Sequence, residues 1–287
     1  MSASHPIIAV TGSSGAGTST AKHAFDDIFR RGNINPVVVE GDSFHRYDRQ
    51  EMPAQIAKAE EQGTTLTHFG PEANHLDRLE NLFQTYSETG KGKSRKYLHN
   101  DVEAADFKQS SGTFTSWEEV GGESDLLFYE GLHGGIITDQ VDIARFVDLM
   151  IGVVPVINLE WIQKIKRDCT NRGYSQEAVV DIILKRMPDY IHHITPQFSR
   201  THINFQRVPL IDTSNPFVMR EIPTPDESLV VIRFKNPKIA DFPYYLSMLK
   251  DSFMSRPNNL VVPAVKMGLA MEVILTPFIN EIIRQKV

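Results

Sequence analysis

A glycine-rich loop near the N-terminus constrains the fold of this chain more than any other feature. It reads Gly12-Ser13-Ser14-Gly15-Ala16-Gly17-Thr18-Ser19 and follows the apolar run Pro6–Thr11. In the pattern G-x-x-x-x-G-K-[ST], backbone N–H groups of the loop bind phosphate oxygens, the lysine reaches the β and γ phosphates, and the hydroxyl binds Mg²⁺. The sequence therefore predicts a strand, a phosphate-binding loop and a helix, in that order.

The residues after the loop support this order. Apolar residues recur there at helical spacing and predict a helix with one buried face that ends near Gly32; they are Ala21, Ala24, Phe25, Ile28 and Phe29. A glycine turn that binds nothing is the alternative interpretation. The succession of strand, loop and helix argues against it, because phosphate binding requires that arrangement.

The loop departs from the usual pattern at one position. Thr18 stands where the lysine is expected, whereas Ser19 keeps the hydroxyl that can bind Mg²⁺. The helix N-terminus still offers unpaired N–H groups and about half a positive charge to an anion. Another cation must therefore balance the charge of a transferred phosphoryl group. Lys22 lies a turn inside the helix, and we expect it to be a solvated surface lysine.

Composition narrows the class of protein. The chain has 287 residues, 41% of them hydrophobic, and a net charge of −6, which gives no signature of nucleic-acid binding. Cys169 is the single cysteine, so no internal disulfide can form. The first predicted strand starts about five residues from Met1, and no run reaches the ~18 apolar residues of a membrane span. We expect a cytoplasmic protein whose partners are small anions, not nucleic acid or membrane.

Short apolar runs alternate with helical segments and predict an α/β fold with a mainly parallel, mixed sheet flanked by helices. The predicted strands are Pro6–Thr11, Pro36–Glu40, Asp125–Tyr129, Met150–Val156, Val208–Asp212, Leu229–Phe234 and Leu260–Val262. We expect residues 1–287 to form a single domain. Residues 43–124 are more polar and contain a basic run, 90–96, followed by Tyr97 and His99. This segment is predicted to be an inserted substrate or lid region; a solvated loop is the alternative for the basic run.

Two carboxylates follow predicted strands at the edge where α/β sheets bind ligands. Asp42 comes after the second strand and can accept the proton of an attacking hydroxyl; a helix N-cap is the alternative. Glu130 ends the third strand and can bind Mg²⁺ directly or through water, or else cap a turn. His45 and Arg49 follow Asp42 and could hold a second phosphate.

A segment that begins at Asn158 offers a replacement for the missing lysine. As a helix it would bury Ile162, Ile165 and Cys169 and place charged residues on the roughly opposite face. The charged residues are Lys164, Arg167, Asp168 and Arg172. This cluster could clamp phosphates, but a solvated helix with i,i+4 salt pairs is an equally natural interpretation of the spacing.

Taken together, these segments resemble phosphoribulokinase of the bacterial type along essentially the whole chain. The matching motifs are Gly12–Ser19, Glu40–Asp42, Phe44–Arg46, Tyr129–His133, Asn158–Lys164, Arg167-Asp168, Arg172–Tyr174, Asn204–Pro209 and Asp212–Pro216. The resemblance implies a P-loop kinase domain similar to nucleoside-monophosphate kinases, with a mobile lid. It also implies that ATP phosphorylates the C1 hydroxyl of D-ribulose 5-phosphate, giving ribulose 1,5-bisphosphate for the Calvin cycle.

The resemblance assigns roles to the residues above. Asp42 would be the general base, Lys164 the missing cation and Asp168 a second essential carboxylate, while Ser19 and Glu130 would hold Mg²⁺. The residues 12–19 would bind the nucleotide. Contacts to the sugar phosphate would come from His45, Arg49, Tyr97, His99, Arg167 and Arg172.

Regulation and assembly are also implied by the resemblance. Bacterial relatives are activated by NADH, inhibited by AMP, and form large homo-oligomers, typically octamers. Arg186, Arg233 and Arg256 are the implied effector contacts, and Lys185 stands where relatives usually carry a second arginine. The redox cysteine pair of the plant type cannot exist in a chain with one cysteine.

Two other functions are considered. A uridine or pantothenate kinase would use the same loop, and residues 68–74 loosely resemble a substrate segment of nucleoside kinases, but such enzymes normally keep the P-loop lysine that Thr18 replaces. A nucleotide-dependent switch protein would be expected to carry a guanine-recognition N-K-x-D motif, which is missing from this sequence.

Overall fold

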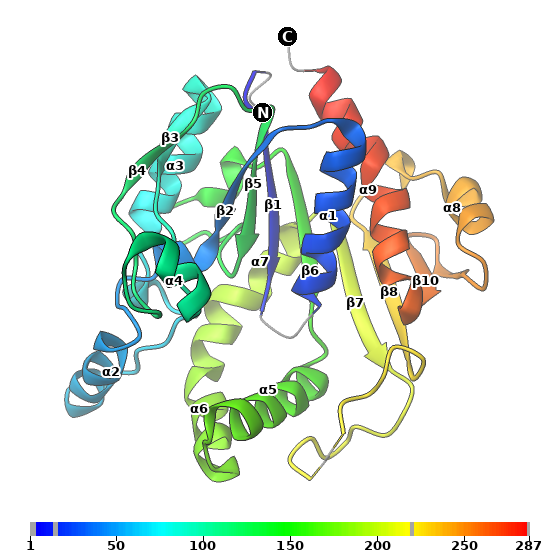
Figure 1. Cartoon of the computed structure of the whole chain (residues 1–287). Helices are drawn as coiled ribbons and strands as arrows, with labels where there is room; N and C mark the ends of the chain where they lie inside the picture. Colours follow the sequence, from blue (N-terminus) through cyan, green and yellow to red (C-terminus); the bar gives the residue numbers. More distant parts are fainter. Residues whose placement is uncertain (1–3, 14–16, 219–220, 286–287) are drawn as a thin grey trace.

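The core of the fold is an extended, mixed β-sheet with helices on both faces (Figure 1). The computed structural model describes residues 4–13, 17–218 and 221–285, with residues 18, 19, 171 and 172 described by their backbone alone. Within these residues the sheet has eight strands: β1 (Ile7–Gly12), β2 (Pro36–Glu40), β5 (Leu126–Gly131), β6 (Leu149–Val154), β7 (Ile203–Pro209), β8 (Ser228–Phe234), β9 (Phe253–Arg256) and β10 (Asn259–Pro263).

The strand order is β2-β5-β1-β6-β7-β8-β10-β9. The first five strands run parallel, and β8, β10 and β9 continue the sheet in antiparallel fashion. Strand β1, which leads into the glycine-rich loop, lies between β5 and β6. The carboxyl ends of β2, β5 and β1 therefore meet at one edge of the sheet.

Helices cover the sheet and extend beyond this edge. They are α1 (Thr18–Gly32), α2 (Glu51–Glu61), α3 (Leu76–Thr89), α4 (Asp101–Phe107), α5 (Ile157–Arg172), α6 (Gln176–Asp189), α7 (Thr195–Arg200), α8 (Phe242–Met248) and α9 (Met267–Arg284). Figure 1 shows α5 and α6 below the carboxyl ends of the strands, and α1 beside α9 on one face of the sheet.

Two apolar cores lie on opposite faces of the sheet. The predicted stripe of α1, from Ala21 to Phe29, is buried together with α9 against alternate residues of β1 and β5. On the other face, Leu79 and Phe83 of α3 pack against Ile7 of β1 and Leu127 of β5. Strands covered on both faces explain why their sequences are continuously apolar.

The structure corrects one expected strand and contains three strands that were not predicted. Strand β7 is Ile203–Pro209, so it precedes most of the predicted Val208–Asp212. The reason is that Ile203 and Phe205 are buried beside β6, whereas the apolar Leu210 is exposed after the strand. Strand β9 and a separate antiparallel pair, β3 (Lys91–Ser94) with β4 (Glu118–Gly121), were not predicted, because each has only four residues and gives too short a sequence signal.

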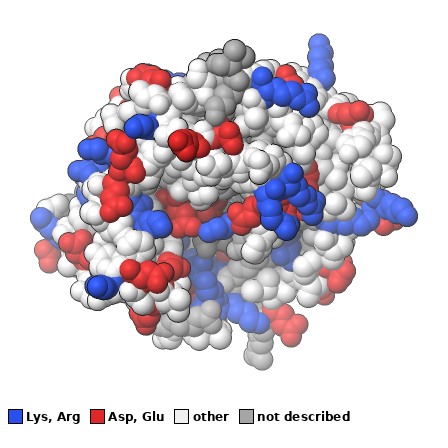
Figure 2. All heavy atoms as spheres, turned by 45° about the horizontal axis from the view of Figure 1, so that its top comes forward, with Lys and Arg blue, Asp and Glu red and all other residues white. Residues whose placement is uncertain are grey.

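Surface charge and helix hydropathy give two further facts. Acidic and basic side chains are interspersed on the face shown in Figure 2. Among the described residues, no helix combines the length and the apolar character that crossing a bilayer requires.

Candidate active site

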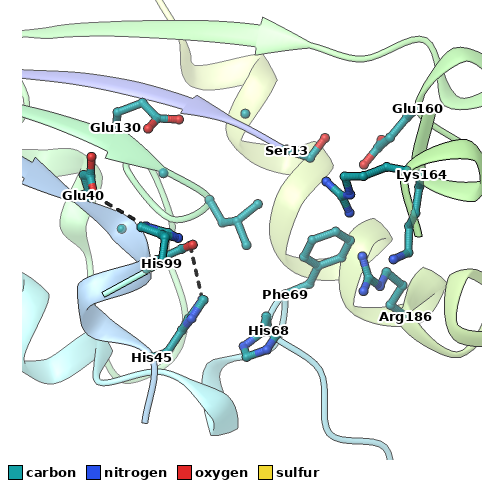
Figure 3. Close-up of a pocket in the computed structure, with 16 residues that line it drawn as sticks. Ser13, Glu40, His45, His68, Phe69, His99, Glu130, Glu160, Lys164 and Arg186 are labelled. Carbon is teal, nitrogen blue, oxygen red and sulfur yellow. Dashed lines mark ion pairs between the residues drawn. The ribbon is translucent and has the colours of Figure 1, made fainter. Parts of the chain in front are cut away.

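A cavity of about 350 Å³ opens at the carboxyl ends of β1, β2 and β5 (Figure 3). Its walls come from these strand ends, from the segments around residues 45, 68 and 99, and from α5 and α6. The lining residues are Gly12, Ser13, Glu40, Gly41, Asp42, His45, His68, Phe69, His99, Glu130, Gly131, Leu132, Glu160, Lys164, Arg167 and Arg186. Segments far apart in the sequence thus share one cavity.

The glycine-rich loop borders this cavity. Gly12 must be glycine because a Cβ there would lie 2.6 Å from the carbonyl oxygen of Val153. Gly17 adopts φ +109° at the start of α1, in the region that favours glycine. Of the predicted nucleotide-binding residues, Ser14, Gly15 and Ala16 lie outside the described residues, as do the side chains of Thr18 and Ser19.

One wall of the cavity is rich in carboxylates. Glu40 and Glu130 are register partners on the adjacent strands β2 and β5, and Asp42 follows β2 directly. Burial, followed by repulsion from Asp42 and Glu40, raises the pKa of Glu130 to about 7. Burial also raises the pKa of Asp42 above its ordinary value. These two carboxylates therefore hold protons more tightly than solvated ones do.

Glu40 behaves differently because two cations contact it. His99 Nε2 lies 3.6 Å from one carboxylate oxygen, and Lys22 Nζ lies 2.8 Å from the other. Hydrogen bonding to His99, then to Lys22, lowers the pKa of Glu40 to about 2, against the effect of burial. The same contact with Glu40 raises the pKa of His99. Lys22, predicted to be a solvated lysine, is about half-exposed and paired.

Two stacked histidines lie beside Asp42. The Nε2 atom of His45 is 3.6 Å from Asp42 Oδ1, and the rings of His45 and His68 have centroids 4.2 Å apart. Burial lowers the pKa of each ring to about 3. Both histidines are therefore neutral near pH 7, so His45 can contact an anion by hydrogen bonding but not by charge.

The opposite wall is basic and comes from α5 and α6. Lys164 and Asp168 are bonded to each other and are only 9% and 2% exposed, and Arg167 Nε donates to Asp168 at 3.0 Å. The i,i+4 salt pair of the alternative interpretation is therefore present, but Lys164 and Asp168 are buried and not solvated. Helix α5 packs its apolar side on α6, not on the sheet, and this turns the charged side toward the cavity. Arg186 of α6 lies over the ring of Phe69, 4.9 Å from its centroid.

Burial and neighbouring charges both affect the pKa of Lys164. Burial, together with the nearby Arg186 and Arg167, lowers its pKa to about 8, although Asp168 opposes the change. Burial tends to raise the pKa of Asp168, but its bonds to Lys164 and Arg167 outweigh this and lower it. The pair is therefore ionised at neutral pH, with the ammonium group facing the cavity (Figure 3).

Several predicted site residues lie outside the cavity lining. Arg49 donates to the carbonyl oxygen of His99 at 2.9 Å, and the Tyr97 ring lies 4.8 Å from the ring of His99. The side chain of Arg172 is outside the described residues. Arg233 and Arg256 lie on β8 and β9, away from the cavity, and both have Asn259 of β10 as their register partner.

Sequence analysis gave no role to four residues that line the cavity. The residues without a predicted role are Glu40, His68, Phe69 and Glu160. Arg186 was predicted only as an effector contact. The signal for His68 and Phe69 was the stretch 68–74, which was noted for its likeness to nucleoside kinases. Glu160 sits one helical turn before Lys164, and burial raises its pKa.

No group of three or more metal-ligating His, Cys, Asp or Glu side chains occurs among the residues whose placement is described. Magnesium needs few protein carboxylates, because it keeps several waters and takes oxygen atoms from phosphates. The carboxylates of Glu130 and Asp42 beside the phosphate-binding loop are compatible with such a site.

The arrangement suits transfer of a phosphoryl group to a hydroxyl. Gly12 and Ser13, at the start of the glycine-rich loop, lie between a wall with the half-exposed carboxylate of Asp42 and a wall with three cations, Lys164, Arg167 and Arg186. Phosphoryl transfer depends on positioning the two reactants and on stabilising negative charge, with a base to accept the hydroxyl proton.

Comparisons with known proteins agree with this chemistry. Residues 7–214 match the model of the "Phosphoribulokinase / Uridine kinase family". The chromosomal phosphoribulokinase of Cupriavidus necator is 61% identical over 287 residues, covering 100% of this chain and 98% of that protein. The probable phosphoribulokinase of Escherichia coli K12 is 56% identical over 286 residues, covering 100% and 99%. The solved phosphoribulokinase from Rhodobacter spheroides has a TM-score of 0.92 at 55% identity and covers 99% of each chain.

Proposed function

This chain belongs to the phosphoribulokinase / uridine kinase family, and we propose that it transfers the γ-phosphoryl group of ATP to the C1 hydroxyl of D-ribulose 5-phosphate. The products are ADP and D-ribulose 1,5-bisphosphate, the carbon dioxide acceptor of the Calvin cycle. The similarity to phosphoribulokinases over the full chain supports this choice within the family. The α/β P-loop kinase fold expected from the sequence is that of the family.

The observation that carries the mechanism is the placement of Asp42 across the cavity from Lys164. Asp42 accepts the proton of the C1 hydroxyl, and its raised pKa makes it a better base than a solvated carboxylate. Lys164, oriented by Asp168, takes the place of the lysine that Thr18 replaces. Arg167 places a second positive charge beside the transferred phosphoryl group. These roles rest on the cavity geometry and on the family likeness.

Mg²⁺ is proposed as the cofactor. Glu130 and Ser19 would hold it, and when bound it would neutralise charge on the β and γ phosphates. The partly buried Glu130 carboxylate supports this role, because a cation beside it would relieve the repulsion from Asp42 and Glu40 that helps to raise its pKa.

The sugar phosphate is proposed to bind between the carboxylate wall and the segment that carries Tyr97 and His99. His45 contributes neutral hydrogen bonds, and His99 contributes charge when protonated. Arg49 and Arg172 complete the proposed contacts. We propose that residues 1–287 act as one domain in which residues 43–124 contribute to the substrate site and its lid.

Regulation and assembly follow the same likeness. We propose NADH as an activator, with Arg186, Arg233 and Arg256 as candidate contacts, and a homo-oligomer in the cytoplasm. An octamer of this 32.4 kDa chain would have a mass of about 260 kDa by light scattering after gel filtration. The position of Arg186 at the cavity favours a role in catalysis as well.

An acceptor panel tests the proposal. ADP release is measured with ATP and Mg²⁺ in the presence of ribulose 5-phosphate, uridine, pantothenate or no acceptor, each with and without NADH. Turnover that requires ribulose 5-phosphate supports the proposed activity, and stimulation by NADH supports the regulatory site. Turnover with uridine or pantothenate instead would assign the chain to another activity in the family, and turnover without an acceptor would favour the switch interpretation.

A further inference from the structure

The turn that carries the proposed base is short and buried. After β2, residues Gly41–Phe44 form one turn of 3-10 helix that ends at His45. The last carbonyl groups of a helix have no partner within the helix, and a buried carbonyl without a hydrogen bond is costly. Ser43, Phe44 and His45 are all buried. Something outside the turn must therefore bind their carbonyl oxygens.

One side chain supplies two of these three hydrogen bonds. Arg95 donates from Nε to the carbonyl oxygen of Ser43 at 2.8 Å and from a terminal nitrogen to that of His45 at 2.5 Å. The backbone N–H of His75 donates to the carbonyl oxygen of Phe44 at 2.7 Å. Three successive carbonyl groups around the turn are thus held, and the guanidinium fork spans the outer two.

Aromatic rings hold the guanidinium group of Arg95 in place. It lies over Phe114, 3.6 Å from the ring centroid, and 4.7 Å from that of Trp117. Cation–π contacts of this kind limit the motion of the side chain. Trp117 also packs edge-on against Phe44 of the turn, with ring centroids 5.4 Å apart. The guanidinium group is therefore held at the turn by polar and aromatic contacts together.

Arg95 also belongs to the segment that contains two candidate substrate contacts. It follows β3 directly, and Tyr97 and His99 come two and four residues later. The Tyr97 ring touches Phe114 and faces His45, at centroid distances of 5.2 and 6.3 Å. A single side chain thus connects this segment to the turn that carries Asp42.

We propose that Arg95 is a positioning residue that holds the Asp42 turn in register with the segment carrying Tyr97 and His99. Arg95 does not line the cavity, so it acts through the turn and not on the substrate. The inference deepens the proposed function, on which it rests for the identity of the reaction. It predicts that Arg95 affects the placement of the base and the sugar phosphate, but not ATP binding, because the nucleotide loop follows another strand.

The test compares Arg95→Lys with Arg78→Lys. Lysine keeps the positive charge but cannot donate to both carbonyl groups from a planar fork. Arg78 is the matched control, because it also lies over Trp117, 4.6 Å from the ring centroid, but it belongs to α3. We expect Arg95→Lys to lower kcat by about 10- to 100-fold and to raise KM for ribulose 5-phosphate, with KM for ATP within about 2-fold of the wild type. Arg78→Lys should keep wild-type kinetics.

A second readout does not depend on the reaction. Amide hydrogen exchange reports the opening of the turn through the N–H groups of His45, Arg46 and His75, which bond to Asp42, Ala73 and Phe44. We expect faster exchange at these amides in Arg95→Lys but not in Arg78→Lys, with Tm nearly unchanged in both. If the variant fails to fold, Arg95→Gln, which keeps one planar donor group, replaces it.

The outcomes separate this inference from the proposed function. Wild-type kinetics in Arg95→Lys would overturn the inference, and so would an equal loss in both variants or an equal rise in KM for ATP. Faster exchange in Arg95→Lys, in a protein whose wild type does not phosphorylate ribulose 5-phosphate, would support the held turn while rejecting the reaction.

Discussion

At the scale of single residues, the protein environment of the site shifts the pKa values of several side chains away from those of solvated groups. The protein around Asp42 and Glu130 in the cavity raises their pKa values, and the burial of Lys164 lowers its pKa. A base with a raised pKa and an acid with a lowered pKa both approach the pH at which an enzyme works. Perturbed values grouped in one cavity are typical of functional sites.

Asp42→Asn is expected to lower activity without lowering stability. Loss of the proposed base should lower kcat by about 10²- to 10⁴-fold, with KM for ATP changed only a few-fold. The raised pKa means that the folded protein binds this proton more tightly than the unfolded chain, so ionisation of Asp42 lowers stability as the pH rises above its ordinary pKa. The variant should therefore be at least as stable as the wild type at pH 7, as measured by urea unfolding.

Asp106→Asn serves as the control for this substitution, because Asp106 is an exposed carboxylate of α4. It should change neither kcat nor the unfolding midpoint. An Asp42→Asn protein that keeps most of its kcat would remove Asp42 as the base.

Lys164 should determine the alkaline limb of the pH profile. Its pKa of about 8 means that the ammonium form predominates below pH 8 and is lost above it. The value of kcat/KM for ATP reports the free enzyme and should fall about tenfold per pH unit above this point. Lys164→Arg keeps its charge at every accessible pH, so whatever activity remains should lack this limb. A limb near pH 8 that persists in Lys164→Arg would contradict the assignment.

At the scale of elements, α3 shows that part of the segment 43–124 belongs to the core of the fold. Leu79 is fully buried against the sheet, together with Phe83. Leu79→Ala should lower the free energy of unfolding by about 2–5 kcal/mol, because it leaves a cavity in a packed core. Asn81→Ala, at an exposed position of the same helix, should change it by less than about 0.5 kcal/mol. Urea unfolding of both variants measures the difference, and equal stabilities would mean that α3 packs loosely.

The elements also show what the sequence could predict. The α1 stripe and strands β1, β2 and β5 were predictable because their signals are local: helical spacing, apolar runs and a glycine loop. The exposure of Lys164 was predicted less well, because spacing alone does not reveal that α5 packs on α6 instead of the sheet. Strand β7 began earlier than predicted because pairing with β6, not apolar content, determined its start.

In the candidate site, too, local signals could be predicted from the sequence, whereas contacts between distant segments could not. Asp42, Glu130 and the loop could be proposed because chemistry at strand ends can be recognised in sequence. Asp42, Glu130 and the start of the loop, Gly12 and Ser13, line one cavity. The contact of Glu40 with His99 and the entry of Arg186 into the cavity could not be found, because they join segments distant in sequence. Such contacts depend on strand order, which no local pattern specifies.

At the scale of the whole molecule, the two walls of the cavity come from different parts of the chain. The histidines and the carboxylates other than Glu160 come from residues 40–130, and the cations come from α5 and α6, residues 157–189. Gly12 and Ser13, at the start of the glycine loop, lie between these walls in space, although they precede both in sequence. Neither part of the chain contains the proposed base together with the proposed cations.

The pairing of β1 with strands far along the chain makes catalytic competence a late event in the life of each chain. Strand β1 pairs with β5 and β6, whose residues leave the ribosome more than 110 positions after it. Closing such long loops is slow compared with forming helices. During refolding from urea, we expect far-UV circular dichroism to recover before turnover does, and simultaneous recovery would contradict this order. A nascent chain that has not reached α6 therefore lacks part of the cavity, so the fold itself delays activity until synthesis has passed the last element of the cavity.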